Sequence, residues 1–189
     1  MKKLILMAAA AALVFTSCDD PNKNDGPAGG AGDYSKLKFN EFYGAGEDNE
    51  KYVELYNTGD VELSLEGVMI EKDGGDLSWE GKAGDKIAAK SVYLILGAKK
   101  TTPNGLQTGF SAKKNVLMEL SDPTGKIIDT FQRGDEPAAD AVWGDVTLPT
   151  NSGSWSRIPD GTGAWKMTAA TMTPGEKNAT EGTDDPDLK

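Results

Sequence analysis

The residue with the most specific chemistry in this sequence is its only cysteine, Cys18. Two small residues, Thr16 and Ser17, precede it directly. Signal peptides are cut after small residues, and a thiol at the cut can carry a lipid. The sequence therefore predicts cleavage between Ser17 and Cys18 and attachment of a diacylglyceryl group to the Cys18 thiol. The alternative is an ordinary secretory signal in which Cys18 is a bystander.

The residues before Cys18 have the pattern of an export signal. Lys2 and Lys3 give a positive start, and residues 4–15 are apolar and uncharged. This run is too short to cross a hydrocarbon core, which takes about 20 residues. We therefore expect residues 1–17 to be a signal peptide that is removed. The acylated cysteine would then hold the chain at a membrane, since two or more acyl chains bind stably.

Residues 18–33 are expected to be the lipidated cysteine and a flexible linker. The stretch 19–33 is rich in Gly and Asp and has no aromatic or β-branched residue, so it cannot bury enough surface to become ordered. Asp19 and Asp20 resemble acidic signals that send some lipoproteins to the outer face of the outer membrane. In other lineages an Asp after the cysteine favours the inner membrane. We expect a lipid-anchored protein of the cell envelope, at the outer membrane and surface-exposed.

The charge of the chain limits its partners. The formal charge is −10, and loss of Lys2 and Lys3 with the signal would make it −12. A protein this acidic repels nucleic acid phosphates and anionic lipids, so nucleic acid is not an expected partner. The lysine pairs at 99–100 and 113–114 are the only candidate binding sites for such anionic partners. We expect both pairs to lie on solvated loops instead.

The sequence lacks the residues that most catalytic mechanisms need. The chain has no histidine, which removes Ser-His and Cys-His nucleophiles and most zinc sites. Neither of the glycine-rich phosphate-binding motifs, G-x-x-x-x-G-K-S/T and G-x-G-x-x-G, occurs in the sequence. Paired carboxylates could still hydrolyse a glycoside, but with 30 Asp and Glu residues some pairs reach the required spacing by chance. We expect no enzymatic activity, and a carboxylate-dependent hydrolase remains the least favoured alternative.

Calcium is the one cofactor hypothesis that the acidic residues support. Residues 46–50 and 72–76 are acidic loops, and their oxygen atoms suit a hard cation. Neither loop has the spacing of an EF-hand, so solvated loops without a metal are the competing and favoured interpretation. No residue is assigned to a metal site.

Strand patterns run through residues 34–178, a length that suits one domain. Leu37 and Phe39 alternate with polar residues, as in a half-buried strand. The continuous apolar run at 92–96 is typical of a strand covered on both faces. Residues 179–189 are polar, and we expect a frayed tail.

Turn signals separate these strands. The segments 115–120 and 126–131 flank Asp-Pro-Thr-Gly at 122–125, the preference of a type I turn, which predicts a hairpin. Gly67 is expected to bend or bulge the strand within 61–71. No segment has helical periodicity, so the sequence predicts an antiparallel sandwich or barrel. Further strands are expected at 52–56, 154–158 and 164–167.

Several of these segments, taken in order, resemble the lamin tail domain family over residues 36–178. The resemblance implies an all-β fold, an immunoglobulin-like antiparallel β-sandwich. It also implies a secreted or surface binding module, because bacterial members are often parts of cell-surface proteins and sometimes accompany hydrolases. Fold alone does not establish function. The matching segments are FNEF (39–42), YVELYNTG (52–59), LSLEGV (63–68), residues 87–97 and 115–129, SRIPDG (156–161) with Trp165, and TPGEKN (173–178).

The resemblance places Glu41 and Glu54 at recurrent acidic positions of the family. In the structural interpretation, these carboxylates bond backbone N–H groups or Arg157 and so join strands. In the functional interpretation, they bind a ligand or a metal. We favour the structural one.

The four tryptophans lie in or beside predicted strands. We expect them to pack in the core and at its edges, whereas an exposed aromatic platform would indicate sugar binding. They are Trp79, Trp143, Trp155 and Trp165.

The leading functional hypothesis is a membrane-anchored, non-catalytic module. It would bind a protein or a glycan through loops or an exposed strand edge. A structural protein of envelope assembly is the alternative. The sequence does not identify the ligand-binding residues.

Overall fold

A computed structural model describes residues 32–97, 104–169 and 171–189. The predictions on the signal peptide, on Ser17 and Cys18, on most of the linker and on the lysine pair at 99–100 lie outside these residues. In the part of the chain that is described, no helix is long and apolar enough to span a membrane.

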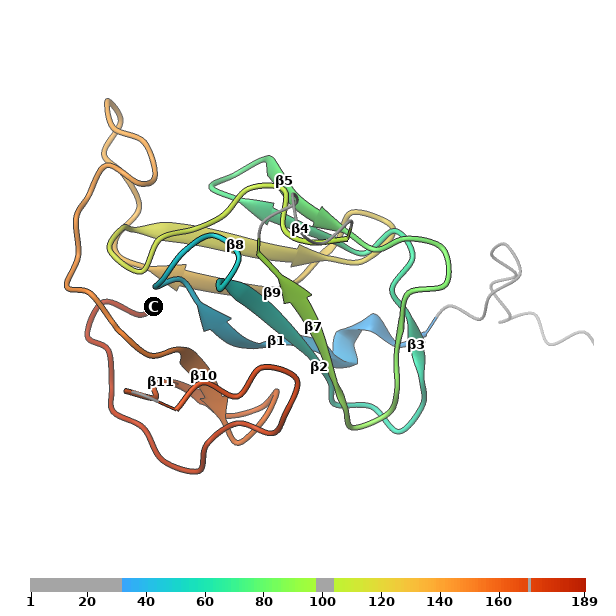
Figure 1. The fold of residues 1–189 in the computed structure, drawn as a ribbon. Coiled ribbons are helices and arrows are strands. Elements are labelled where there is room, and N and C mark those ends of the chain that lie inside the picture. Colours follow the sequence, from blue (N-terminus) through green and yellow to red (C-terminus); the bar gives the residue numbers. More distant parts are fainter. Residues whose placement is uncertain (1–31, 98–103, 170) are drawn as a thin grey trace, which may run out of the picture. The chain divides into compact units, whose positions relative to one another are not determined.

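Two antiparallel sheets form an immunoglobulin-like β-sandwich, which confirms the predicted fold class (Figure 1). The five-stranded sheet has the order β11 (Ala164–Met167), β10 (Trp155–Ile158), β1 (Leu37–Tyr43), β2 (Tyr52–Asn57) and β7 (Val92–Leu96). The four-stranded sheet has the order β5 (Asp76–Glu80), β4 (Met69–Lys72), β8 (Val116–Ser121) and β9 (Ile127–Arg133). A short 3-10 turn, Tyr34–Lys36, precedes β1, and β3 (Leu63–Ser64) pairs with β6 (Lys86–Ile87).

Aromatic side chains fill the space between the two sheets. Phe42 of β1 stacks on Phe131 of β9 with 4.1 Å between the ring centroids. Trp155 and Trp165 both pack against Phe131. Trp79 lies in the same buried cluster. Alternate residues of a strand point to one face, so the apolar positions of these strands build one core, and the core interpretation is confirmed for these three tryptophans.

A bulge in β1 separates the core from a second, polar layer. The register with β2 shifts between Phe39 and Glu41, and such an extra residue reorients the side chains around it. Phe39 and Phe42 both belong to the core, while Asn40 and Glu41 between them are fully buried and polar. These two residues hydrogen-bond to segments near the C-terminus, as described below.

The hairpin of β8 and β9 forms as predicted. The Asp122 carboxylate accepts hydrogen bonds from the backbone N–H of Thr124 at 2.8 Å and of Lys126 at 3.1 Å. The N–H of Gly125 closes the turn on the carbonyl of Asp122. The sequence predicts this turn well because all of these hydrogen bonds join residues that are close in the sequence.

Gly67 bends the chain, also as predicted, but the outcome is larger than a bulge. Its φ is +76°, in the left-handed region that favours glycine. The segment 61–71 therefore divides into β3 and β4, which pair with different strands.

The expectation that residues 92–96 form a strand covered on both faces is wrong. These residues do form β7, but β7 lies at the edge of its sheet and pairs only with β2 among the described strands. Leu96 is 38% exposed. The apolar character of the run has another cause, because Tyr93 packs against Trp79 and the Leu96 carbonyl accepts a hydrogen bond from the N–H of Leu106 in a crossing loop.

The expectation of a frayed tail at 179–189 is also wrong. Thr183 forms a β-bridge with Met167, and Leu188 forms one with Arg133. The side chain of Asp185 is buried against Arg133. A polar segment is ordered here because its carboxylate meets a buried guanidinium, a partner that local sequence does not reveal.

Candidate functional site

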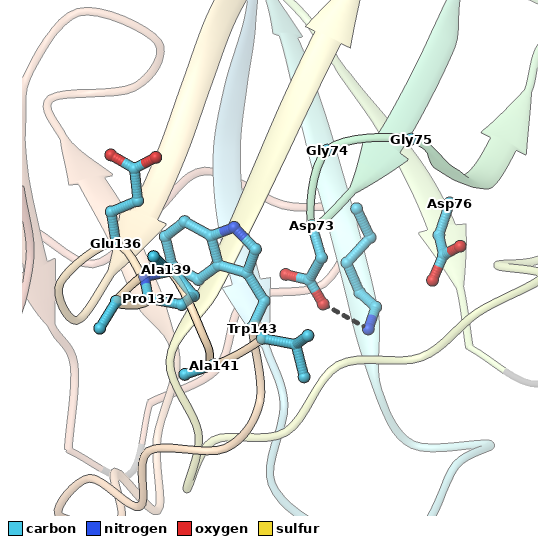
Figure 2. Close-up of a pocket in the computed structure, with 12 residues that line it drawn as sticks. Asp73, Gly74, Gly75, Asp76, Glu136, Pro137, Ala139, Ala141 and Trp143 are labelled. Atoms are coloured by element: carbon cyan, nitrogen blue, oxygen red, sulfur yellow. Dashed lines mark hydrogen bonds and ion pairs between the residues drawn. The ribbon is translucent and has the colours of Figure 1, made fainter.

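An open groove lies between the turn that joins β4 to β5 and the long loop that joins β9 to β10 (Figure 2). Its volume is about 730 Å³, within the roughly 300–1,000 Å³ of typical ligand pockets. One wall carries Asp73 and Asp76, and the other carries Glu136 and Trp143. The groove is lined by Lys72, Asp73, Gly74, Gly75, Asp76, Glu136, Pro137, Ala138, Ala139, Ala141, Val142 and Trp143.

Asp73 fixes the first wall. Its φ is +58°, an uncommon conformation that Asp tolerates better than most residues. Its backbone N–H donates to the carbonyl of Leu117 at 2.8 Å, and its Oδ1 accepts from the N–H of Leu117 at 3.1 Å. Its Oδ2 pairs with the Lys72 ammonium at 2.7 Å. The turn is therefore tied to β8, and its two glycines form the tip.

Asn115 fixes the second wall. Its side chain is buried just before β8. Its Oδ1 accepts hydrogen bonds from the backbone N–H of Gly144 at 2.9 Å and of Val146 at 3.2 Å. Its Nδ2 donates to the carbonyl of Asp135 at 3.3 Å. One amide thus holds both ends of the loop segment that carries Trp143.

Trp143 differs from the other three tryptophans. Trp79 and Trp155 donate their indole N–H groups to Asn104 and Asp185. Trp165 packs against Phe131. Trp143 has no hydrogen bond or ring contact with any described residue, and its indole lines the groove (Figure 2). Trp143 is partly buried and does not belong to the core cluster, so the expectation of packing at the core or its edge stays a prediction for this residue.

The groove combines an aromatic face with several oxygen acceptors. An indole offers a flat apolar surface with one N–H donor. Asp76 and Glu136 carry carboxylates, each of which can accept hydrogen bonds from neighbouring hydroxyl groups. In Figure 2 the Trp143 ring lies between the Glu136 loop and the Asp73 turn. This set of groups suits a polyhydroxylated ligand whose ring stacks on the indole.

The predicted acidic residues Glu41 and Glu54 lie together, but away from the groove. They are register partners on β1 and β2, and both are fully buried. Glu54 accepts hydrogen bonds from Asn40 Nδ2 at 2.8 Å and from the N–H of Gly175 at 2.7 Å. Burial raises the pKa of Glu54 to about 7, against the opposite effect of these two hydrogen bonds.

Glu41 has a similar structural role. Its carboxylate accepts hydrogen bonds from the hydroxyls of Ser154 and Thr173. It also accepts from the backbone N–H of Thr173 at 3.2 Å. The two glutamates thus fasten the segment 173–178 over the sheet, which agrees with the structural interpretation. The structural interpretation also offered Arg157 as a partner of these glutamates. That part is wrong, because Arg157 pairs with Asp129 at 3.0 Å.

Three carboxylates of the two acidic loops proposed for calcium are used by contacts within the protein. In 46–50, Glu50 accepts a hydrogen bond from the N–H of Glu47 at 2.9 Å, and Asp48 pairs with Lys51. In 72–76, Asp73 binds β8 and Lys72. Among the described residues, no group of three or more Asp, Glu, His or Cys side chains could hold a metal ion. The expectation that these loops are solvated and hold no metal stays a prediction.

Sequence reasoning missed Trp143 and Asn115 as parts of a site. Trp143 lies in the segment 132–153, which carries little strand pattern. The only local signal was a tryptophan among Gly, Pro, Ala and Asp residues, outside the strands that need a core. Nothing in the sequence links Asn115 to a loop that begins about 20 residues later.

The comparison with protein families identifies most of this framework. The model of the Lamin Tail Domain family matches residues 31–135, which are 105 of the 189 residues of the chain. The match contains β1 to β9 and the Asp73 wall of the groove, whereas Trp143 lies beyond it. No similar sequence is found among curated proteins. Because the family match covers more than half of the chain and agrees with the β-sandwich, the chain belongs to the lamin tail domain family.

Proposed function

We propose that this chain is a lipid-anchored protein of the cell envelope that binds a carbohydrate chain in the groove beside Trp143, without catalysis. The lamin tail domain supplies an immunoglobulin-like scaffold. The groove supplies the binding surface. Cys18 would supply the membrane attachment and keep the groove outside the cell.

The single observation that carries this proposal is the indole of Trp143. Removing the exposed face of an apolar ring from water is favourable, so such a face in a groove can stabilise a bound ligand. The buried Asn115 amide holds the loop that carries this ring, and the partly buried indole lines the groove without a hydrogen bond or ring contact to another described residue. A sugar ring that stacks on the indole would cover it, and the hydroxyl groups of the sugar would bond to Asp76 and Glu136.

The paired glutamates support a non-catalytic role. Glu41 and Glu54 form a carboxylate pair on neighbouring strands, but both are fully buried under the segment 173–178. A catalytic carboxylate has to reach its substrate. This pair is therefore better placed to join segments of the fold than to hydrolyse a ligand.

A glycan array tests the proposal. The full chain, expressed from its own start codon and purified in detergent, is applied to neutral and acidic oligosaccharides. We expect selective binding that Trp143→Ala abolishes and Trp143→Phe reduces only in part, because a phenyl ring keeps an apolar face. Val146→Ala is the control, since Val146 is 47% exposed on the same loop and does not line the groove.

Two outcomes would count against the proposal. If the wild-type chain binds no glycan on the array, carbohydrate binding is rejected. A protein partner or a role in envelope assembly is then the better hypothesis. Binding that Trp143→Ala leaves intact would move the site away from the groove.

A further inference from the structure

A second hollow adjoins the groove. It has a volume of about 340 Å³ and shares Lys72 and Asp73 with the groove as lining residues. Its lining also includes Lys51, Ser111 and Lys114. The two hollows therefore differ in charge, because the groove holds three carboxylates and one lysine, whereas the second hollow holds three lysines and two aspartates.

Among the described residues, Lys114 is the lysine of the second hollow that forms no ion pair with a carboxylate. Lys51 pairs with Asp48 at 2.9 Å, and Lys72 pairs with Asp73 at 2.7 Å. The Lys114 ammonium contacts only the Thr147 hydroxyl, at 3.2 Å, among the described residues. In a chain with a formal charge of −10, this is a local positive site.

Hydrogen-bond donors remain available beside this charge. An ammonium has three N–H donors, and Lys114 gives one of them to Thr147. The Ser111 hydroxyl accepts from the N–H of Lys113 at 3.2 Å, but it donates to no described residue. Two N–H groups and one O–H group can thus meet the two oxygens of a carboxylate, and hydrogen bonds of this kind are strengthened by the charge.

The chain path links this site to Trp143. Trp143 lines the groove, and the next residue, Gly144, lines the second hollow. Lys114 and Thr147 form a β-bridge, and the adjacent Asn115 binds the N–H of Gly144. A ligand that stacks on Trp143 can therefore continue toward Lys114.

We infer that the bound glycan carries a single carboxylate, as a uronic acid residue on an otherwise neutral chain, and that Lys114 and Ser111 bind this carboxylate. This inference rests on the proposed function. A polyanionic glycan does not fit, because Asp76, Glu136 and the net charge of the chain would repel its other carboxylates. One carboxylate at Lys114 and neutral sugar units over Trp143 match the charges of both hollows.

Matched oligosaccharides test this ligand class. Xylo-, galacto-, manno- and gluco-oligosaccharides are prepared with one glucuronic acid branch and again after carboxyl reduction, which leaves a neutral glucose branch on the same chain. Affinity for the full wild-type chain is measured by calorimetry. For the sugar chain that binds, we expect the glucuronic acid form to bind about tenfold more tightly, the effect of one charge-assisted hydrogen bond.

Variants then assign the preference to Lys114. Lys114→Gln should bind the two forms with equal affinity, while Lys114→Arg should keep the preference. Lys113→Gln is the matched control, because it removes the same charge from an exposed neighbour that does not line the hollow. It should keep the preference as well.

The outcomes separate this inference from the proposed function. Equal wild-type affinity for the acidic and reduced forms overturns the inference and leaves carbohydrate binding intact. A Lys114→Gln variant that loses both forms equally, or that keeps the preference, also overturns it. Failure of the wild-type chain to bind any of these sugars or any glycan on the array rejects the proposed function, and the inference with it.

Discussion

Arg133 at the end of β9 donates its Nε–H to Asp185, which lies 52 residues later, at 2.7 Å, and both side chains are only 2% exposed. The Trp155 indole donates to the same carboxylate at 2.8 Å. Although burial raises the pKa of Asp185, hydrogen bonds from Arg133, Asp187 and Trp155 outweigh it and leave the pKa below its ordinary value. The C-terminal segment is thus attached to the sandwich by buried hydrogen bonds.

Replacement of Asp185 should destabilise the protein strongly. Asp185→Asn leaves the Arg133 charge buried without its main partner, and loss of one member of a buried ion pair costs about 3–5 kcal/mol. Urea unfolding followed by far-UV circular dichroism measures the change. Asp184→Asn is the control, since Asp184 pairs with Lys166 at the surface, where such pairs contribute about 0–1 kcal/mol. Similar effects of the two substitutions would contradict the buried role of Asp185.

Glu54 should make the protein less stable as the pH rises. Its pKa is about 7 in the folded protein, against an ordinary value of 4.5, so the folded state holds a proton that the unfolded state has already released. The free energy of unfolding therefore falls as pH rises from about 4.5 to 7, by up to about 3 kcal/mol.

Urea unfolding between pH 5 and 8 tests this prediction. The wild-type chain should lose stability over this range relative to Glu54→Gln, which cannot titrate at this position. The exposed Glu66→Gln should follow the wild-type curve. A wild-type curve parallel to that of Glu54→Gln would show that Glu54 is already ionised at pH 5.

The fold was predictable because its signals are local. The Asp122 turn, the alternation around Phe39 and the bend at Gly67 each depend on neighbouring residues, and each was predicted. The exposure of β7 was not predicted. The apolar run 92–96 has the same sequence pattern whether a second strand or a crossing loop covers it.

The candidate site was less predictable than the fold. The groove depends on contacts between residues far apart in the chain, such as Asn115 with Gly144 and Asp73 with Leu117. Asparagine and aspartate are ordinary turn residues, so their types give no hint of these partners. For Glu41 and Glu54, the family resemblance indicated the positions and left two roles open, and the structure shows the backbone hydrogen bonds that support the structural role.

Lipid attachment at Cys18 can be tested directly. Cys18→Ser removes the thiol that would carry the lipid, so the variant should lose incorporation of radiolabelled palmitate and leave the membrane fraction. Ser17→Ala is the control, because it keeps a small residue before the cysteine and should be labelled normally. Label and membrane association that survive Cys18→Ser would reject the anchor.

Calcium should have little effect on stability. The carboxylates of Glu50 and Asp73 are already used by backbone N–H groups, so a cation would have to displace these hydrogen bonds. We expect the Tm in EDTA and in millimolar calcium to agree within about 1 °C. A clear rise of Tm in calcium would establish a site and would be expected to disappear in Asp73→Asn if the loop 72–76 provides it.

Asn115, which also lines the second hollow, should hold the Trp143 loop in place through its hydrogen bonds to the loop backbone. Asn115→Ala removes the acceptor for the N–H groups of Gly144 and Val146, and each buried hydrogen bond lost costs about 1–3 kcal/mol. The loop should then open locally more often and become accessible to proteases. Chymotrypsin cleavage after Trp143, followed by mass spectrometry, measures this opening under native conditions.

A second asparagine separates this local effect from general destabilisation. Asn104→Ala removes side-chain hydrogen bonds to Asp85 and Tyr93 in a different loop. It should lower the free energy of unfolding as well, yet leave cleavage after Trp143 unchanged. Since proteolysis through local opening follows the stability of the loop rather than that of the whole protein, equal acceleration in both variants would mean that Asn115 stabilises the fold and does not position the groove.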